Sequence, residues 1–182
     1  MADRPVILRP TDAFNEAKKA FESGGVIAFP TETFYGLSVD PFNPKAIERL
    51  FKLKGRAEAN PVSVIIANKE MLGRVAVDIP ATAFKLIDRF WPGPLTLVLN
   101  AHPDIPPTLI ANTGKIGVRV SGSETARKLS EYLSSPITAT SANPSGKRPP
   151  VEANEVLAYF NGEIDVLIDG GSLPGRLGST VV

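Results

Sequence analysis

The sequence contains no cysteine and a single histidine, His102. The absence of cysteine excludes disulfide bonds, thiolate zinc sites and thiol nucleophiles. One histidine cannot form a metal site that needs several imidazole ligands. Any chemistry must therefore come from hydroxyl, amide and carboxylate groups and from the cations of lysine and arginine.

An excess of charge of one sign is also missing, since 20 Lys and Arg face 19 Asp and Glu, for a net charge of +1. Domains that hold nucleic acid through bulk charge usually carry a clear basic excess. The balanced charge argues against that class of protein, but it is compatible with a local basic patch. The N-terminal stretch MADRPVILRP has no apolar core of signal-peptide length, and the apolar runs are of strand length. We therefore expect a soluble, cytoplasmic protein.

The chain of 182 residues, with 43% hydrophobic and 21% charged residues, has the composition of a globular protein. We predict a single domain over residues 1–182. Apolar stretches of strand length alternate with amphipathic stretches of helical length, which predicts the α/β class. The predicted strands are 26–29, 62–67, 95–99, 116–120, 137–140 and 166–169, and a glycine-rich loop over 169–178 precedes STVV. The predicted helices begin after a cap at Thr11 or Asp12, at Pro44, at Ala81, after Ser123 and at Glu152. Four phenylalanines are predicted to lie in the core, namely Phe14, Phe21, Phe51 and Phe84.

Two polar motifs stand where such elements end. The first is Lys54-Gly55-Arg56, with Asn60 shortly behind it, and the second is the TSANPSG stretch 140–146. Their cations, hydroxyls and amides suit a polyphosphate or another anion. Each has an ordinary alternative, because cations favour helix C-termini and Ser, Asn, Pro and Gly favour surface turns.

The stretch FPTETFYGL places Thr31, Thr33 and Tyr35 directly after a buried strand. The carboxyl ends of strands in α/β sheets border the ligand crevice, although threonines also bond the backbone locally in turns. Spacing alone favours the local turn. In IGVRV, Arg119 points either outward from an edge strand or inward to a cleft. If it points inward it must meet an anion, because an unpaired buried guanidinium is costly.

Seven segments, in this order and across residues 24–182, resemble the YrdC/TsaC family of threonylcarbamoyl-AMP synthases: FPTETFYGL, KLKGRAEANP, WPGPLTLVL, IGVRV, TSANPSG, IDGG and GST. The resemblance implies a twisted α/β fold in which a mixed parallel and antiparallel sheet, flanked by helices, surrounds a concave basic cleft. It also implies the synthesis of threonylcarbamoyl-AMP and pyrophosphate from L-threonine, bicarbonate or CO2, and ATP with Mg²⁺. A downstream threonylcarbamoyl-transferase complex then modifies position 37 of tRNA.

The resemblance assigns site residues position by position. It implies catalytic roles for Lys54, Arg56, Ser141 and Asn143. It implies contacts with substrates for Thr31, Thr33, Tyr35, Asn60, Arg119, Thr140, Ser179 and Thr180. It implies no metal ligand in the protein itself.

Two alternatives remain. One is a non-catalytic RNA-binding module that uses the same basic cleft and contacts tRNA directly. The balanced charge and the lack of aromatic residues interleaved with basic ones argue against it. The other is a carbamoyl-adenylate-forming domain, as in hydrogenase-maturation carbamoyltransferases. Those are long chains with cysteine-rich zinc modules, and this sequence contains no cysteine.

Overall fold

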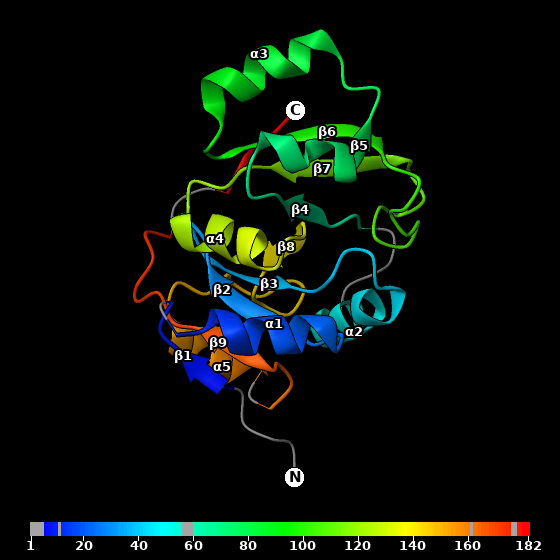
Figure 1. Ribbon diagram of the computed structural model, residues 1–182. Helices are drawn as coiled ribbons and strands as arrows, with labels where there is room; N and C mark the ends of the chain where they lie inside the picture. The colour runs from blue at the N-terminus through cyan, green and yellow to red at the C-terminus, as the bar shows by residue number, and fades with distance from the viewer. Residues whose placement is uncertain (1–5, 11, 56–59, 161, 176–177) are drawn as a thin grey trace.

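The computed structural model describes residues 6–10, 12–55, 60–160, 162–175 and 178–182 (Figure 1). Arg56, predicted as a catalytic residue, lies outside these ranges. Within them no helix has both the length and the apolar character that a membrane crossing requires.

The described strands form one sheet in the order β1-β9-β2-β3-β8-β4-β7-β6-β10, with β5 paired to β6. Parallel pairs, such as β2 with β9 and β4 with β7, lie beside antiparallel ones, such as β3 with β8. The predicted mixed sheet flanked by helices is therefore confirmed. The strands are β1 (Val6–Leu8), β2 (Ile27–Pro30), β3 (Tyr35–Ser38), β4 (Ser63–Ile65), β5 (Ala76–Val77), β6 (Leu95–Ala101), β7 (Lys115–Arg119), β8 (Ile137–Ser141), β9 (Val166–Ile168) and β10 (Thr180–Val181).

Five α-helices and a short 3-10 helix pack on the sheet in the described residues. They are α1 (Phe14–Glu22), α2 (Pro44–Lys54), η1 (Lys69–Arg74), α3 (Ala81–Phe90), α4 (Glu124–Tyr132) and α5 (Ala153–Phe160). Helices α1 and α4 contact each other and share β2 as a neighbour, so they cover the same face (Figure 1).

Two apolar clusters occupy the two faces of the sheet. Successive side chains of a strand point to opposite faces, and β2 shows this directly. Ile27 and Phe29 join the cluster beneath α1 and α4, whereas Ala28 joins the larger cluster that α2, α3 and α5 help to build. All four residues of β2 are buried. This burial on both faces explains why the sequence shows a continuous apolar run here rather than an alternation.

Helix ends follow the local sequence in two cases and depart from it in one. Asn43 caps α2, which ends at Gly55 with a left-handed φ of 56° that favours glycine, and Ser123 caps α4. The predicted cap of α1 at Asp12 is wrong, because the helix begins after Ala13, which makes no side-chain cap. Ala13 is fully buried, so its packing fixes the start of α1. The other suggested cap, Thr11, lies outside the described residues.

The prediction for Phe84 is also wrong, since this side chain is 46% exposed. Ala83 and Ile87 form the buried stripe of α3, and Phe84 lies one position off that stripe. Phe21 and Phe51 are buried, and Phe14 is partly buried against the cluster under α1. Strands β1, β3, β5 and β10 and the helix η1 were not predicted.

Candidate active site

A cavity of about 170 Å³ opens on the face of the sheet that α1 and α4 partly cover. Strand β4 shows its position: Ile65 packs in the cluster under α4, and Ser63, two residues earlier on the same face, lines the cavity. Seven residues that the resemblance assigns to the site line this cavity. They are Thr31, Thr33, Tyr35, Arg119, Thr140, Ser141 and Ser179.

Small residues on neighbouring strands make the floor of the cavity. Gly36 on β3 pairs with Ser141 on β8, and Ser63 on β4 pairs with Ala139. Beside Ser63, a Cβ on Gly117 of the neighbouring strand β7 would lie 2.4 Å from Ser63 Oγ, so only glycine fits there. Ser63 and Thr96 also line the cavity, and neither was predicted from the sequence. A single polar residue inside an apolar strand was the signal that could have identified them.

The turn after β2 satisfies both interpretations of its threonines. Thr31 Oγ1 donates to Phe34 O at 2.6 Å and accepts from Thr33 N at 3.3 Å, which is the local turn that spacing favoured. The same turn holds the two hydroxyl oxygens 3.3 Å apart at the wall of the cavity. Local bonding thus fixes the direction in which Thr33 faces the cavity.

Arg119 points inward and is 9% exposed. The anion that an inward position requires is Glu32, whose Oε1 accepts from Arg119 Nη1. Burial lowers the pKa of Arg119, and the neighbouring Glu32 carboxylate opposes that shift. Arg119 is the charged side chain among the described residues that line the cavity.

Tyr35 is among the residues that line the cavity, but its fully buried side chain packs in the larger apolar cluster and its hydroxyl is engaged elsewhere. The hydroxyl donates to Gly171 O at 2.8 Å, accepts from Gly170 N at 3.0 Å and lies 3.2 Å from Asp169 Oδ1. Burial, with a contribution from the charge of Asp169, raises the pKa of Tyr35 to about 12. Tyr35 therefore fixes the IDGG loop to the wall of the site.

The end of the chain completes the rim. Ser179 Oγ lies 2.8 Å from Thr96 Oγ1 on β6, and both side chains line the cavity. Further back, Gly175 N donates to Thr33 O at 3.0 Å, which joins the glycine-rich loop to the turn after β2. Thr180, in β10, is exposed and pairs with Leu95 of β6. It is not among the residues that line the cavity.

Lys54 joins the two polar motifs directly. It is 2% exposed, and its Nζ donates to Ser141 O and, at 2.6 Å, to Asn143 O. Asn143 Nδ2 donates to Lys147 O at 2.6 Å, and this hydrogen bond holds the two ends of the same loop together. Within the described part of the chain, the buried Asn143 Oδ1 has no hydrogen-bond donor. Lys54 and Asn143 thus lie behind Ser141 rather than at the surface of the cavity. Asn60 is exposed and lies outside the cavity lining.

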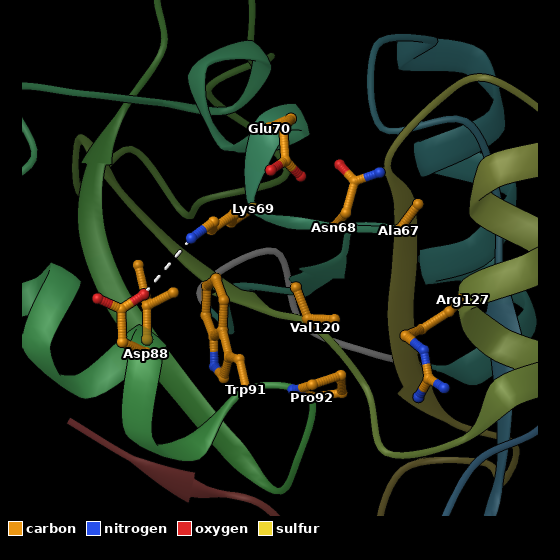
Figure 2. Close-up of a pocket in the computed structure, with 10 residues that line it drawn as sticks. Ala67, Asn68, Lys69, Glu70, Asp88, Trp91, Pro92, Val120 and Arg127 are labelled. Atoms are coloured by element: carbon orange, nitrogen blue, oxygen red, sulfur yellow. Dashed lines mark ion pairs between the residues drawn. The ribbon is translucent and has the colours of Figure 1, made fainter.

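A second and larger hollow of about 370 Å³ lies between η1, α3 and α4. Figure 2 shows Trp91 and Pro92 between the Lys69–Asp88 ion pair, 3.5 Å long, and Arg127 on α4. No residue that the resemblance assigns to the site lines this hollow, so the smaller cavity is the candidate active site. Over the described ranges, no three His, Asp or Glu side chains come together as ligands for a metal.

Comparison with known proteins places these residues in a wider group. A family model named for Sua5, YciO and YrdC, and described as "Telomere recombination", matches residues 19–182. The matched range contains strands β2 to β10 and every described residue that lines the cavity.

Two relatives carry the name threonylcarbamoyl-AMP synthase. The Pyrococcus abyssi protein is 43% identical over 159 residues, which cover 87% of this chain and 47% of the relative. The Halorhodospira halophila protein is 38% identical over 162 residues, which cover 89% of this chain and 82% of the relative. The chain therefore spans about half the length of the first relative and most of the second.

A solved structure, that of P. abyssi Sua5 complexed with L-threonine, has a TM-score of 0.90 to this chain at 39% identity. The match covers 98% of this chain and 53% of the other. The cavity described above thus lies in a fold that, in the Pyrococcus protein, is found in complex with an amino acid.

Proposed function

The chain belongs to the Sua5/YciO/YrdC family, and from this membership we propose that it is a threonylcarbamoyl-AMP synthase. Its substrates are L-threonine, bicarbonate or CO2, and ATP. One observation carries the proposal: four separate stretches of the chain bring seven of the assigned residues to one small polar cavity.

The reaction needs no covalent bond to the protein. Bicarbonate takes up a proton and loses water to give CO2. The amine of threonine attacks the carbon of CO2, and a carbamate forms with release of one proton, which balances the proton taken up by bicarbonate. A carbamate oxygen then attacks the α-phosphorus of ATP, and the bond to pyrophosphate breaks. Alignment of the reactants and neutralisation of phosphate charge are the main requirements. A site without cysteine and with hydroxyls, amides and cations can meet them.

The amino acid fits the cavity through its charge and its hydroxyl. We assign its carboxylate to the Arg119 guanidinium, which is held at the wall of the cavity. Thr33 and Ser179 offer hydroxyl groups for the remaining polar atoms, and Thr140 and Ser141 border the reacting groups. A cavity of about 170 Å³ suits a molecule of the size of threonine.

The nucleotide is assigned to the side where the two polar motifs meet. Asn143 Oδ1 is a buried acceptor that a donor of the ligand would satisfy. Lys54 keeps a positive charge behind this loop while it holds the carbonyl groups of Ser141 and Asn143. Arg56, which follows α2, and Asn60 keep their predicted roles in phosphate and nucleotide binding, and Thr180 keeps its predicted role in substrate binding.

Mg²⁺ is expected to enter as part of the nucleotide. The cavity offers hydroxyl groups, and Glu32, the carboxylate bonded to its Arg119, is already engaged by that ion pair. This donor set fits a magnesium ion held mainly by phosphate oxygens and water, as is usual for nucleotide substrates. Such an ion would neutralise charge on the phosphates.

The product is a mixed anhydride of a carbamic and a phosphoric acid, which water hydrolyses. It must therefore pass quickly to an acceptor, for which we propose a threonylcarbamoyl-transferase complex that acts on tRNA in the cytoplasm. Direct contact between this chain and tRNA stays a prediction.

The proposal is tested by measuring pyrophosphate release from ATP with threonine and bicarbonate omitted in turn. We expect release only when both are present. Release that continues unchanged without threonine would overturn the assignment.

Ser141→Ala tests the place of the reaction within the cavity. Loss of one hydrogen bond to a charged group, worth about 1.5–3 kcal/mol, should slow pyrophosphate release roughly ten- to a hundredfold. Ser145→Ala is the matched control, because Ser145 is exposed on the same loop. Both variants should keep the melting temperature of the parent protein. Equal rates for the two variants would contradict this placement of the reaction.

A further inference from the structure

Glu32 contacts the site only through Arg119. Its carboxylate accepts from Arg119 Nη1 on one oxygen and from Ser121 Oγ, at 2.5 Å, on the other. The side chain is 19% exposed and is not among the residues that line the cavity. Glu32 therefore bonds a residue of the cavity without lining the cavity itself.

The loop that bonds Glu32 is itself fixed by hydrogen bonds. Ser121 Oγ accepts from Ser123 N at 3.1 Å, and Ser121 O accepts from Arg127 Nη1 at 2.6 Å. Ser123 Oγ in turn donates to Pro30 O at 3.0 Å, at the end of β2. The loop between β7 and α4 is thus bonded both to Glu32 and to Pro30 at the start of the turn that carries it. Figure 2 shows Arg127 projecting from α4 toward this loop.

We propose that Glu32 is a positioning residue that fixes the plane of the Arg119 guanidinium for the carboxylate of the substrate. This inference rests on the proposed function. A planar guanidinium binds a carboxylate well only when its fork is held in the matching orientation. Glu32 accepts from Nη1 while Arg119 itself lines the cavity, so the other N–H groups of Arg119 are left to meet a ligand there.

The pair also explains how the cavity tolerates a buried guanidinium before the ligand binds. Arg119 is 9% exposed, and without a counter-charge its burial would disfavour the inward conformation. With Glu32 in place, the charge of Arg119 is balanced and its direction is fixed in advance. The substrate then does not have to order this side chain when it binds.

A different role for Glu32 has the opposite consequence. If Glu32 competed with the substrate for Arg119, its removal would free the guanidinium and tighten binding of threonine. If Glu32 only stabilised the fold, its removal would lower the melting temperature and leave threonine affinity unchanged.

The test uses Glu32→Gln, which keeps the size of the side chain, and Glu131→Gln as a control for the loss of one acidic charge. Glu131 is exposed on α4. Calorimetric titration with L-threonine should show about tenfold weaker binding for Glu32→Gln, while ATP affinity stays within about twofold. The control should match the parent protein in both titrations. Unchanged or tighter threonine binding in Glu32→Gln would overturn the proposal.

A double-mutant cycle shows whether Glu32 acts through Arg119. We would measure kcat/KM for threonine in Glu32→Gln, Arg119→Gln and the double variant, since this ratio remains measurable when binding is weak. In the Arg119→Gln background, the change at Glu32 should alter kcat/KM less than about twofold. Fully additive effects would contradict a role through Arg119. A parent protein that binds no threonine would instead refute the proposed function, so the two failures are distinguishable.

Discussion

The hydroxyl of Tyr35 is bonded to a loop that lies 134 to 136 residues further along the chain. It accepts from one backbone N–H of this loop and donates to one of its carbonyl groups. Both partners would lose a hydrogen bond in a protected environment if the hydroxyl were removed. The residue that the sequence suggested as a ligand contact is therefore also a support for the wall of the site.

Tyr35→Phe should lower the free energy of unfolding by about 1–3 kcal/mol, because it removes the part-buried hydrogen bonds to Gly171 O and from Gly170 N. Urea unfolding at pH 8 measures the loss. Tyr159→Phe is the matched control, since the Tyr159 hydroxyl bonds only an exposed carbonyl group, at 3.2 Å. Equal losses in the two variants would contradict the supporting role of Tyr35.

The same tyrosine predicts a dependence on pH. Its pKa is about 12 in the folded protein and about 10 when unfolded. Because the folded value is the higher one, its contribution to stability is complete below pH 10 and is lost as the pH rises toward 12. The difference in stability between the parent and Tyr35→Phe should therefore shrink over that range. A difference that stays constant from pH 8 to pH 12 would contradict the shift.

Individual residues show how much of the candidate site could be predicted from the sequence. The cost of burying a charge was enough to state that an inward Arg119 needs an anion. It could not identify Glu32, which is 87 residues away in the sequence. The same holds for Lys54: its basic character suggested phosphate, but its bonds to Ser141 O and Asn143 O depend on how the chain folds back.

At the scale of the elements, the floor of the cavity depends on close packing between β4 and β7. Gly117→Ala would place a Cβ 2.4 Å from Ser63 Oγ and 3.2 Å from Thr96 Cγ2. Overpacking of this kind typically costs about 1–3 kcal/mol. We expect a lower melting temperature and weaker threonine binding, as seen by thermal unfolding and calorimetry.

Two further variants sharpen this prediction. Gly73→Ala is the control, because a Cβ there meets no atom within 4 Å. Adding Ser63→Ala to Gly117→Ala removes the oxygen at 2.4 Å and should restore part of the stability. A double variant no more stable than Gly117→Ala alone would show that another contact causes the loss.

The elements themselves were largely predictable where composition and position agree. Helices α2 and α4 carry strong caps and an amphipathic pattern, and they lie close to where the sequence predicts them. Strand β3 was missed because its sequence, YGLS, contains a glycine and a serine at buried positions. Its partners β2 and β8 stabilise it, and pairing with β8 is a long-range contact that local sequence does not reveal.

At the scale of the whole molecule, the sheet is continuous from β1 to β10 among the described residues. Two apolar clusters, one on each face, share its strands. Folding of one cluster should therefore require folding of the other, which supports the prediction of a single domain over residues 1–182.

This coupling predicts coincident unfolding transitions. Trp91, the single tryptophan, reports on the end of the sheet near α3, whereas far-ultraviolet circular dichroism reports on all helices and strands. Both signals should give the same midpoint in urea. Midpoints that differ beyond error would mean that the two ends of the sheet unfold separately.

The order of the strands also has a consequence for the growing polypeptide. Strands β2 and β3 can pair as soon as they are made, but β9, which flanks β2, begins at Val166. At about 5–20 residues per second, the ribosome needs roughly ten seconds to add the intervening stretch. Both edges of this apolar hairpin are open until β8 is made to pair with β3, and the β2 edge stays open until β9 is made. An open edge is a surface that favours pairing with other chains. We therefore expect the nascent chain, rather than the finished protein, to be the species that depends most on chaperones.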